Sequence, residues 1–102
     1  TGASPLQFDD LSVDVRARTA VRGGRTLQLS TREFDLLTFF LRHPNVVLSE
    51  DVIKEGVWGE DFFGQSNVVA VVVRALRREL EAEDAARLIQ TIRGAGYVLR
   101  QA

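Results

Sequence analysis

Three arginines lie close together in the second half of the stretch from Gln65 to Leu80, QSNVVAVVVRALRREL. They are Arg74, Arg77 and Arg78. A guanidinium can donate two parallel hydrogen bonds to phosphate oxygens, or to O6 and N7 of guanine. The cluster therefore indicates a surface that could bind a nucleic acid, although solvated helices often carry similar clusters.

The stretch around these arginines has the period of an amphipathic helix over about 66–81. At about 100° per residue, four aliphatic side chains share one side: Val69, Val73, Leu76 and Leu80. The other side carries Asn67, Val71, Arg74 and Arg78. Ser66 or Asn67 can supply the N-cap oxygen. A helix anchored on one side and basic on the other is suited to insertion into a major groove.

The composition restricts the kinds of site that the chain can hold. Its 102 residues suffice for one domain and one core. No cysteine is present, and His43 is the single histidine, so we expect no disulfide, no metal site and no cofactor. No apolar run is long enough to span a membrane or to resemble a secretory signal, so we expect a cytoplasmic protein.

Charge is distributed unevenly along a chain whose net charge is −1. Residues 1–64 carry seven basic and ten acidic side chains, whereas residues 65–102 carry six basic and four acidic ones. The half that contains the arginine cluster is thus basic. A local patch of this kind can bind phosphate even on a nearly neutral protein.

The N-terminal third predicts a meander of strands. Residues 1–5 (TGASP) are typical of a linker or an expression remnant, and the folded domain is expected over 6–102. Four short antiparallel strands with one apolar face are expected at 6–8, 11–15, 19–21 and 26–29, with a turn at Gly23-Gly24.

The remainder predicts three helices and a hairpin. Ser30, with Glu33 three residues later, begins a helix that ends near Arg42. Ser49 begins a second helix, which Trp58-Gly59 ends, and the helix at about 66–81 follows. Residues 88–93 and 97–100 form a hairpin around Gly94-Ala95-Gly96. This order predicts an α+β winged helix-turn-helix fold.

Five segments in this order carry a resemblance to a known family. They are LSTREFDLL at 29–37, LSEDVI at 48–53, VWG at 57–59, VRALRREL at 73–80 and QTIRGAGY at 90–97. Together they resemble the OmpR/PhoB-type DNA-binding domain, the winged-helix effector domain of two-component response regulators. The resemblance covers nearly the whole chain.

The resemblance implies a role for each candidate residue. The third helix would enter the major groove of double-stranded promoter DNA, and the hairpin wing at 88–100 would reach the minor groove. DNA-contacting positions would be Trp58, Asn67, Val68, Val71, Arg74, Arg77, Arg78, Thr91, Arg93 and Tyr97. In some members the loop after the second helix meets RNA polymerase, here through Glu60, Asp61 and Phe63. Members typically bind as homodimers and respond to a sensor kinase through a receiver domain that these residues do not include.

Several of these residues have a structural alternative. Trp58 and Tyr97 could be core aromatics with a satisfied polar tip. Arg77 could instead pair with Glu81 at i+4. For His43, at a helix end before a proline, we expect no functional role.

The chain also departs from the family pattern. Ala75 stands where members often have an arginine, and Glu50 where many have a phosphate-binding one. Only Val69 and Val73 of the valine-rich segment 68–73 are expected in the core. One interpretation is a DNA-binding domain that reads thymine methyl groups and DNA shape. The alternative is a protein-interaction module that uses an exposed aliphatic face, Val68–Val73. Without a glycine-rich phosphate loop or grouped acids, we do not expect an enzyme.

Overall fold

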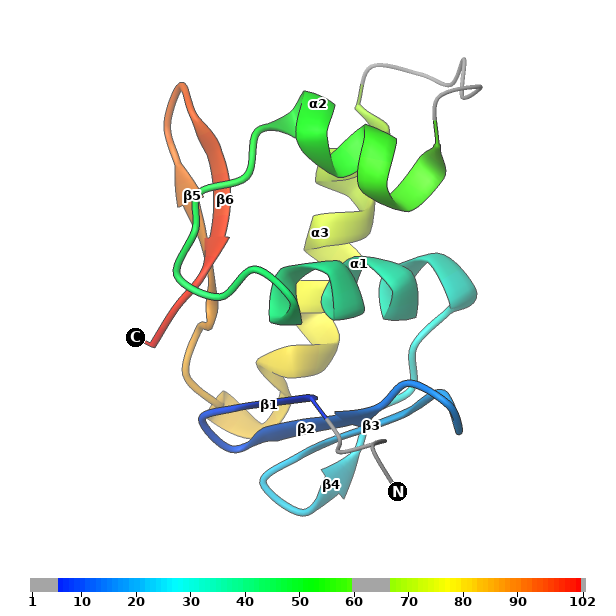
Figure 1. Ribbon diagram of the computed structural model, residues 1–102. Coiled ribbons are helices and arrows are strands. Elements are labelled where there is room, and N and C mark those ends of the chain that lie inside the picture. Colours follow the sequence, from blue (N-terminus) through cyan, green and yellow to red (C-terminus); the bar gives the residue numbers. More distant parts are fainter. Residues whose placement is uncertain (1–5, 60–66, 102) are drawn as a thin grey trace.

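The computed structural model describes residues 6–59 and 67–101, and its elements follow the predicted order (Figure 1). The strands are β1 Leu6–Phe8, β2 Leu11–Asp14, β3 Thr19–Arg22, β4 Arg25–Thr26, β5 Ile89–Ile92 and β6 Gly96–Leu99. The α-helices are α1 Thr31–Leu41, α2 Glu50–Ile53 and α3 Val68–Leu80. Within the described ranges, no helix has the length and apolar character needed to cross a membrane.

The first four strands form an antiparallel sheet in sequence order. Leu11, Val13 and Ala20 are buried on its inner face, as the alternation predicts. The predicted fourth strand is present, but its predicted bounds, 26–29, are wrong, because β4 spans Arg25–Thr26. Leu27 still donates its N–H to the Ala20 carbonyl, but the next N–H, that of Gln28, bonds to the Glu79 carboxylate of α3. The chain therefore leaves the sheet there and turns toward α1.

Helix α1 begins with the predicted capping box. The Ser30 hydroxyl accepts from the Glu33 N–H, and the Glu33 carboxylate accepts from the Ser30 N–H, so two free backbone donors are satisfied. The helix lies between the sheet and α2 and crosses α3 (Figure 1). Its buried side chains pack against α3 and form the centre of the core: Phe34, Leu36, Leu37, Thr38, Phe40 and Leu41.

The predicted second helix is present but changes its winding. Ser49 caps α2, and after Ile53 the helix continues as a π-helix, Lys54–Trp58, until Gly59 at φ 95° ends it. A side-chain carbon on Gly56 would lie 2.3 Å from the Phe39 ring. The absence of a side chain at Gly56 therefore lets this helix approach α1 closely.

Helix α3 buries the four aliphatic side chains that its period predicts, each no more than 1% exposed. Asn67 is at the N-cap position, but its side chain makes no capping hydrogen bond. The prediction that only Val69 and Val73 of segment 68–73 meet the core is wrong. Val68 and Val72 are half-buried and pack against the core, because they flank the buried stripe.

The C-terminal hairpin pairs β5 with β6, and we refer to it, with its turn at residues 93–95, as the wing. Leu48 and Tyr97 exchange two backbone hydrogen bonds, of 2.7 and 2.9 Å, which attach the wing to the segment before α2. Gly96 makes this attachment possible. It has φ 144°, and a side-chain carbon there would lie 2.0 Å from the Leu48 carbonyl oxygen.

Candidate nucleic-acid interface

The outer face of α3 presents unpaired cations. Arg74 and Arg78 are exposed, and neither forms a hydrogen bond or ion pair with the residues that the structure describes. Val71, one turn before them, is 54% exposed. The buried face of the helix fixes their direction, so this outer face combines an apolar side chain with two guanidinium groups.

Arg77 is used inside the protein. Its Nε donates to the Ile89 carbonyl at 2.9 Å, an Nη donates to the Thr91 hydroxyl, and the guanidinium lies over the Tyr97 ring. Burial, followed by the positive charge of Arg87, lowers the pKa of Arg77. The alternative pairing with Glu81 is wrong. Arg77 therefore ties α3 to the wing.

Glu81 forms its ion pair with Arg87, a residue that sequence reasoning missed. Arg87 lies in the segment between α3 and β5, outside any periodic element, so no helical or strand pattern singled it out. Its proximity to the arginines of α3 depends on the chain turning back after Leu80. A groove of about 400 Å³ runs here between α3 and the wing, lined by Val73, Arg74, Arg77, Arg78, Glu81, Arg87 and Tyr97 among others.

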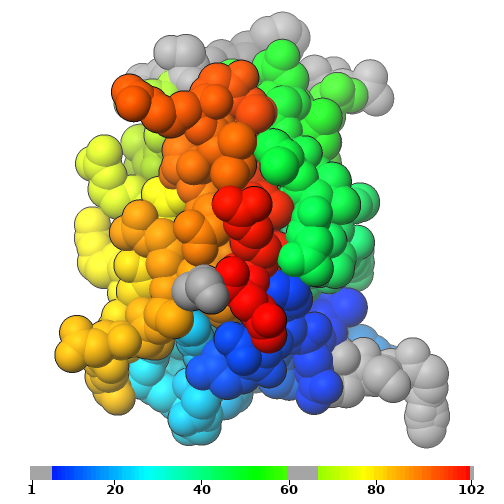
Figure 2. Space-filling view, turned by 90° about the vertical axis from the view of Figure 1, so that its left-hand side faces the viewer, coloured from blue at the N-terminus to red at the C-terminus, as the bar shows by residue number. Residues whose placement is uncertain are grey.

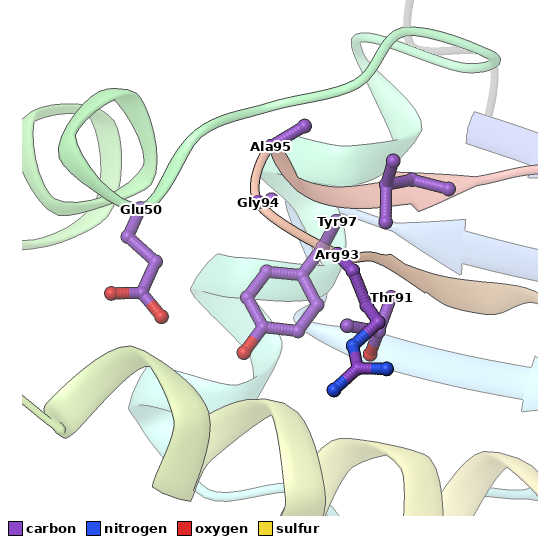
Figure 3. A pocket seen from close by; sticks show the side chains of 8 residues that line it. Glu50, Thr91, Arg93, Gly94, Ala95 and Tyr97 are labelled. Atoms are coloured by element: carbon purple, nitrogen blue, oxygen red, sulfur yellow. The ribbon is translucent and has the colours of Figure 1, made fainter.

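The wing turn forms a second hollow, of about 330 Å³, against the start of α2. Figure 3 shows Glu50 on one side of it and Arg93 on the other, with the Tyr97 ring between them. Arg93 and Thr91 are exposed, and Arg93 has no bonding partner in the described parts of the chain. The wing thus carries one available cation, which faces a carboxylate across the hollow.

Tyr97 is only 8% exposed, and its ring belongs to the core. This position agrees with the core-aromatic alternative, while the residue also lines both hollows. Burial, with a further contribution from the Glu50 carboxylate, raises the pKa of Tyr97, and the Arg77 charge opposes the shift. The neutral phenol is therefore the form that the folded protein favours.

Trp58 is half-buried and packs against the core. The Arg32 guanidinium lies 5.2 Å from the Trp58 ring centroid, and Arg32 also donates to the Val57 carbonyl at 2.8 Å. These contacts fix the indole at the end of the π-helix. Asn67 is exposed at the start of α3. Glu60, Asp61 and Phe63, the predicted polymerase-contact positions, lie outside the described residues.

The N-terminal sheet holds the other end of α3. Arg22 is 4% exposed; its Nε bonds to the Asp10 carboxylate at 3.0 Å and its Nη1 to the Leu80 carbonyl at 2.8 Å. Arg25 donates to the Glu79 carbonyl at 3.1 Å. Cations at a helix C-terminus satisfy its free carbonyls and interact favourably with the negative end of its dipole. The sheet thereby fixes the axis of α3, and hence where Arg74 and Arg78 point.

Figure 2 shows α3 in yellow along one edge of the molecule, with the orange wing above it. Three helices, the third packed against the first, followed by a two-stranded hairpin beside that helix, are the arrangement of the winged-helix class. Residues 24–99 match the family described as "Transcriptional regulatory protein, C terminal". The chain belongs to this family, the OmpR/PhoB-type DNA-binding domain, and the resemblance drawn from its five segments is confirmed.

Individual relatives agree with this assignment. The response regulator MprA of Mycolicibacterium vanbaalenii is 44% identical over 99 residues, which are 97% of this chain and 43% of MprA. CusR of Escherichia coli, a transcriptional regulatory protein, is 41% identical over 96 residues, or 94% of this chain and 42% of CusR. The chain therefore spans less than half the length of these relatives.

A solved structure confirms the fold. The RstA DNA-binding domain of Klebsiella pneumoniae, solved in complex with the RstA box, has a TM-score of 0.82 and is 27% identical. The match covers 94% of this chain and 96% of that one. The predicted winged helix, with its four-stranded sheet, three helices and C-terminal hairpin, is confirmed.

Proposed function

We propose that this domain binds double-stranded promoter DNA sequence-specifically, as the output domain of a transcriptional response regulator. Helix α3 enters the major groove and the wing reaches the adjacent minor groove. The observation that carries the proposal is the placement of three cations, Arg74, Arg78 and Arg93, on exposed parts of α3 and the wing, where none has a bonding partner among the described residues. Homology to MprA and the likeness to the DNA-bound RstA domain support it.

Each predicted contact has a place in this proposal. Arg74 and Arg78 reach phosphates or guanine edges, and Arg93 enters the minor groove, whose narrow A·T tracts attract arginine. Val71 meets a thymine methyl group from the middle of the exposed face. Thr91 lies exposed on the wing, where it can contact the DNA backbone, and Asn67 lies exposed at the N-terminal end of α3. Trp58, Val68, Arg77 and Tyr97 act mainly by holding these groups in place.

The protein-interaction alternative requires an exposed aliphatic face, and the structure exposes less of that face than the sequence indicated. Of the segment Val68–Val73, only Val71 is exposed, while two of its residues are buried and three are half-buried. A docking interface of standard size needs a broad contiguous patch. Within this segment α3 offers one exposed aliphatic side chain, and Arg74 follows it one turn later on the same face.

Fluorescence anisotropy on a pool of random-sequence duplexes, from low to physiological salt, tests the proposal. The logarithm of the affinity should fall linearly with the logarithm of salt concentration, with a slope corresponding to roughly three to five phosphate contacts. Arg93→Ala should weaken binding and reduce the slope by about one unit. No binding at low salt would sink the DNA proposal and turn attention to Val71 and its neighbours as a protein-binding surface.

Homology to longer relatives also suggests what the full-length protein contains and binds. We propose that a receiver domain, answering to a sensor kinase, belongs to the full-length protein, because the relatives are more than twice as long as the matched region. We further propose that two copies bind a pair of half-sites, since pairing of weak sites raises affinity. Contact of Glu60, Asp61 and Phe63 with RNA polymerase, and a cytoplasmic location, belong to the same proposal.

A further inference from the structure

The groove between α3 and the wing holds a concentration of positive charge that the protein leaves incompletely balanced. Arg74, Arg77, Arg78 and Arg87 line it, and Glu81 is the one acid among its lining residues. Glu81 pairs with Arg87, so three further guanidinium groups face the same space. Like charges gathered in a confined groove repel one another and attract an anion.

Arg87 is held in a fixed position in this groove. Its Nε donates to one Glu81 carboxylate oxygen at 2.9 Å and its Nη2 to the other at 3.3 Å. A bidentate pair of this kind fixes the plane of the guanidinium. An arginine has five N–H donors, so a donor edge at Nη1 is left for a further acceptor. The Arg87 side chain is 54% exposed, which keeps that edge open to solvent.

The residues around Arg87 favour one anion that Arg87 and a neighbouring arginine bind together. Arg77 is less available, because its Nε and Nη2 already bond to the Ile89 carbonyl and the Thr91 hydroxyl and its side chain is partly buried. Arg78 and Arg74 are unpaired within the described residues and lie about one and two turns of α3 before Glu81, respectively. A phosphate placed over the C-terminal half of α3 would thus meet Arg78 from the helix and Arg87 from the segment that follows it.

We propose that Arg87 is a further phosphate-binding residue, which binds the DNA backbone together with Arg78, and that Glu81 positions Arg87. The inference rests on the proposed function and adds a contact to it. Arg87 lies beyond the end of α3, so it meets the sugar-phosphate backbone at the edge of the major groove. Its contribution is independent of base sequence, as phosphate contacts are.

The test measures the affinity of the unaltered domain and of Arg87→Gln for the random-sequence duplex pool at a series of salt concentrations. Arg87→Gln should weaken binding to every duplex by a similar factor, about tenfold, and lower the salt slope by about one unit. Arg87→Lys keeps the charge and should restore most of the slope. Arg16→Gln makes the same charge change on an exposed residue of the turn between β2 and β3 and should leave the slope unchanged.

Three outcomes overturn the inference. If Arg87→Gln binds with an unchanged slope while the unaltered domain binds with its full slope, Arg87 serves only Glu81 and the proposed function still stands. If Arg16→Gln lowers the slope as much as Arg87→Gln does, only net charge matters. A failure of the unaltered domain to bind any duplex overturns the proposed function as well. Thermal unfolding of all variants shows that each compared protein is folded.

Discussion

Arginines at two regions of α3 serve opposite purposes. At its C-terminal end, Arg22 and Arg25 come from the sheet and donate to backbone carbonyls of the last turn. On its outer face, Arg74 and Arg78 belong to the helix itself and have no partner among the described residues. The first pair stabilises the fold, and the second is available to a ligand. Residue type alone does not separate the two uses.

The comparison teaches that burial and partners decide what a guanidinium does. Arg22 is almost completely buried and bonds to Asp10 and Leu80, so its guanidinium is not available to a ligand. Arg77 lies between the extremes, since it faces the groove but bonds to the wing. Four substitutions, ordered by expected effect, can break or sharpen this division.

Arg22→Met should have the largest effect, and on stability. It removes two charge-assisted hydrogen bonds and leaves the Leu80 carbonyl buried without its donor, which costs about 3 kcal/mol of unfolding free energy. Urea denaturation measures the loss. Arg16→Met is the matched control, because Arg16 is exposed and should change stability by less than about 0.5 kcal/mol. Equal stability of the two variants would contradict the capping role of Arg22.

Arg77→Met should lower stability and affinity together. The wing loses its bonds from α3 to Ile89 and Thr91, which reduces the unfolding free energy by about 2 kcal/mol. Because the wing then moves relative to α3, DNA affinity falls as well. Comparing urea denaturation with anisotropy separates the two effects. A loss of affinity at undiminished stability would instead place Arg77 in direct contact with DNA.

Arg78→Ala should affect binding and leave folding intact. An exposed arginine without partners in the described chain contributes little to stability, so its removal changes the unfolding free energy by less than about 0.5 kcal/mol. DNA affinity should fall by about tenfold, which corresponds to about 1.4 kcal/mol. If Arg78→Ala lowered the unfolding free energy but left DNA affinity unchanged, the division between the two regions would be wrong.

The smallest effect concerns pH and Tyr97. Its pKa is raised by burial and by Glu50, so the folded state favours the neutral phenol. The resulting stabilisation is complete below the unfolded-state pKa, about 10, and is lost as pH rises through the higher folded-state value. Urea unfolding at about pH 8 and about pH 11 should show this loss. Tyr97→Phe should diminish it, and an identical alkaline loss in that variant would remove Tyr97 as its source.

Much of the fold could be predicted because its signals are local. The capping box at Ser30 and Glu33 and the apolar stripe of α3 depend on residues three or four positions apart. Glycines likewise marked two of the hairpin turns correctly, the one between β3 and β4 and the one between β5 and β6. The predicted bounds of the fourth strand, 26–29, were wrong for a non-local reason, since the Gln28 N–H finds its acceptor on Glu79.

The candidate site was predictable in part. Its helix, its wing and its exposed cations Arg74, Arg78 and Arg93 followed from spacing and from the family resemblance. Arg87 was missed, because it lies in an irregular segment and reaches the groove only after the chain turns. The valine face was overestimated, since the period of the helix marks a buried stripe but does not show how much its flanks are covered.

The sequence by itself determined the order of elements, the buried face of α3 and the membership of a DNA-binding family. Periodicity and motif order can be read along the chain without any knowledge of tertiary contacts. Only the tertiary structure decided which arginines remain available. The bond from Arg22 to the Leu80 carbonyl spans 58 positions, and Arg77 meets Ile89 from another element. A guanidinium binds whichever acceptor folding brings within reach, so its role depends on residues far away in the chain.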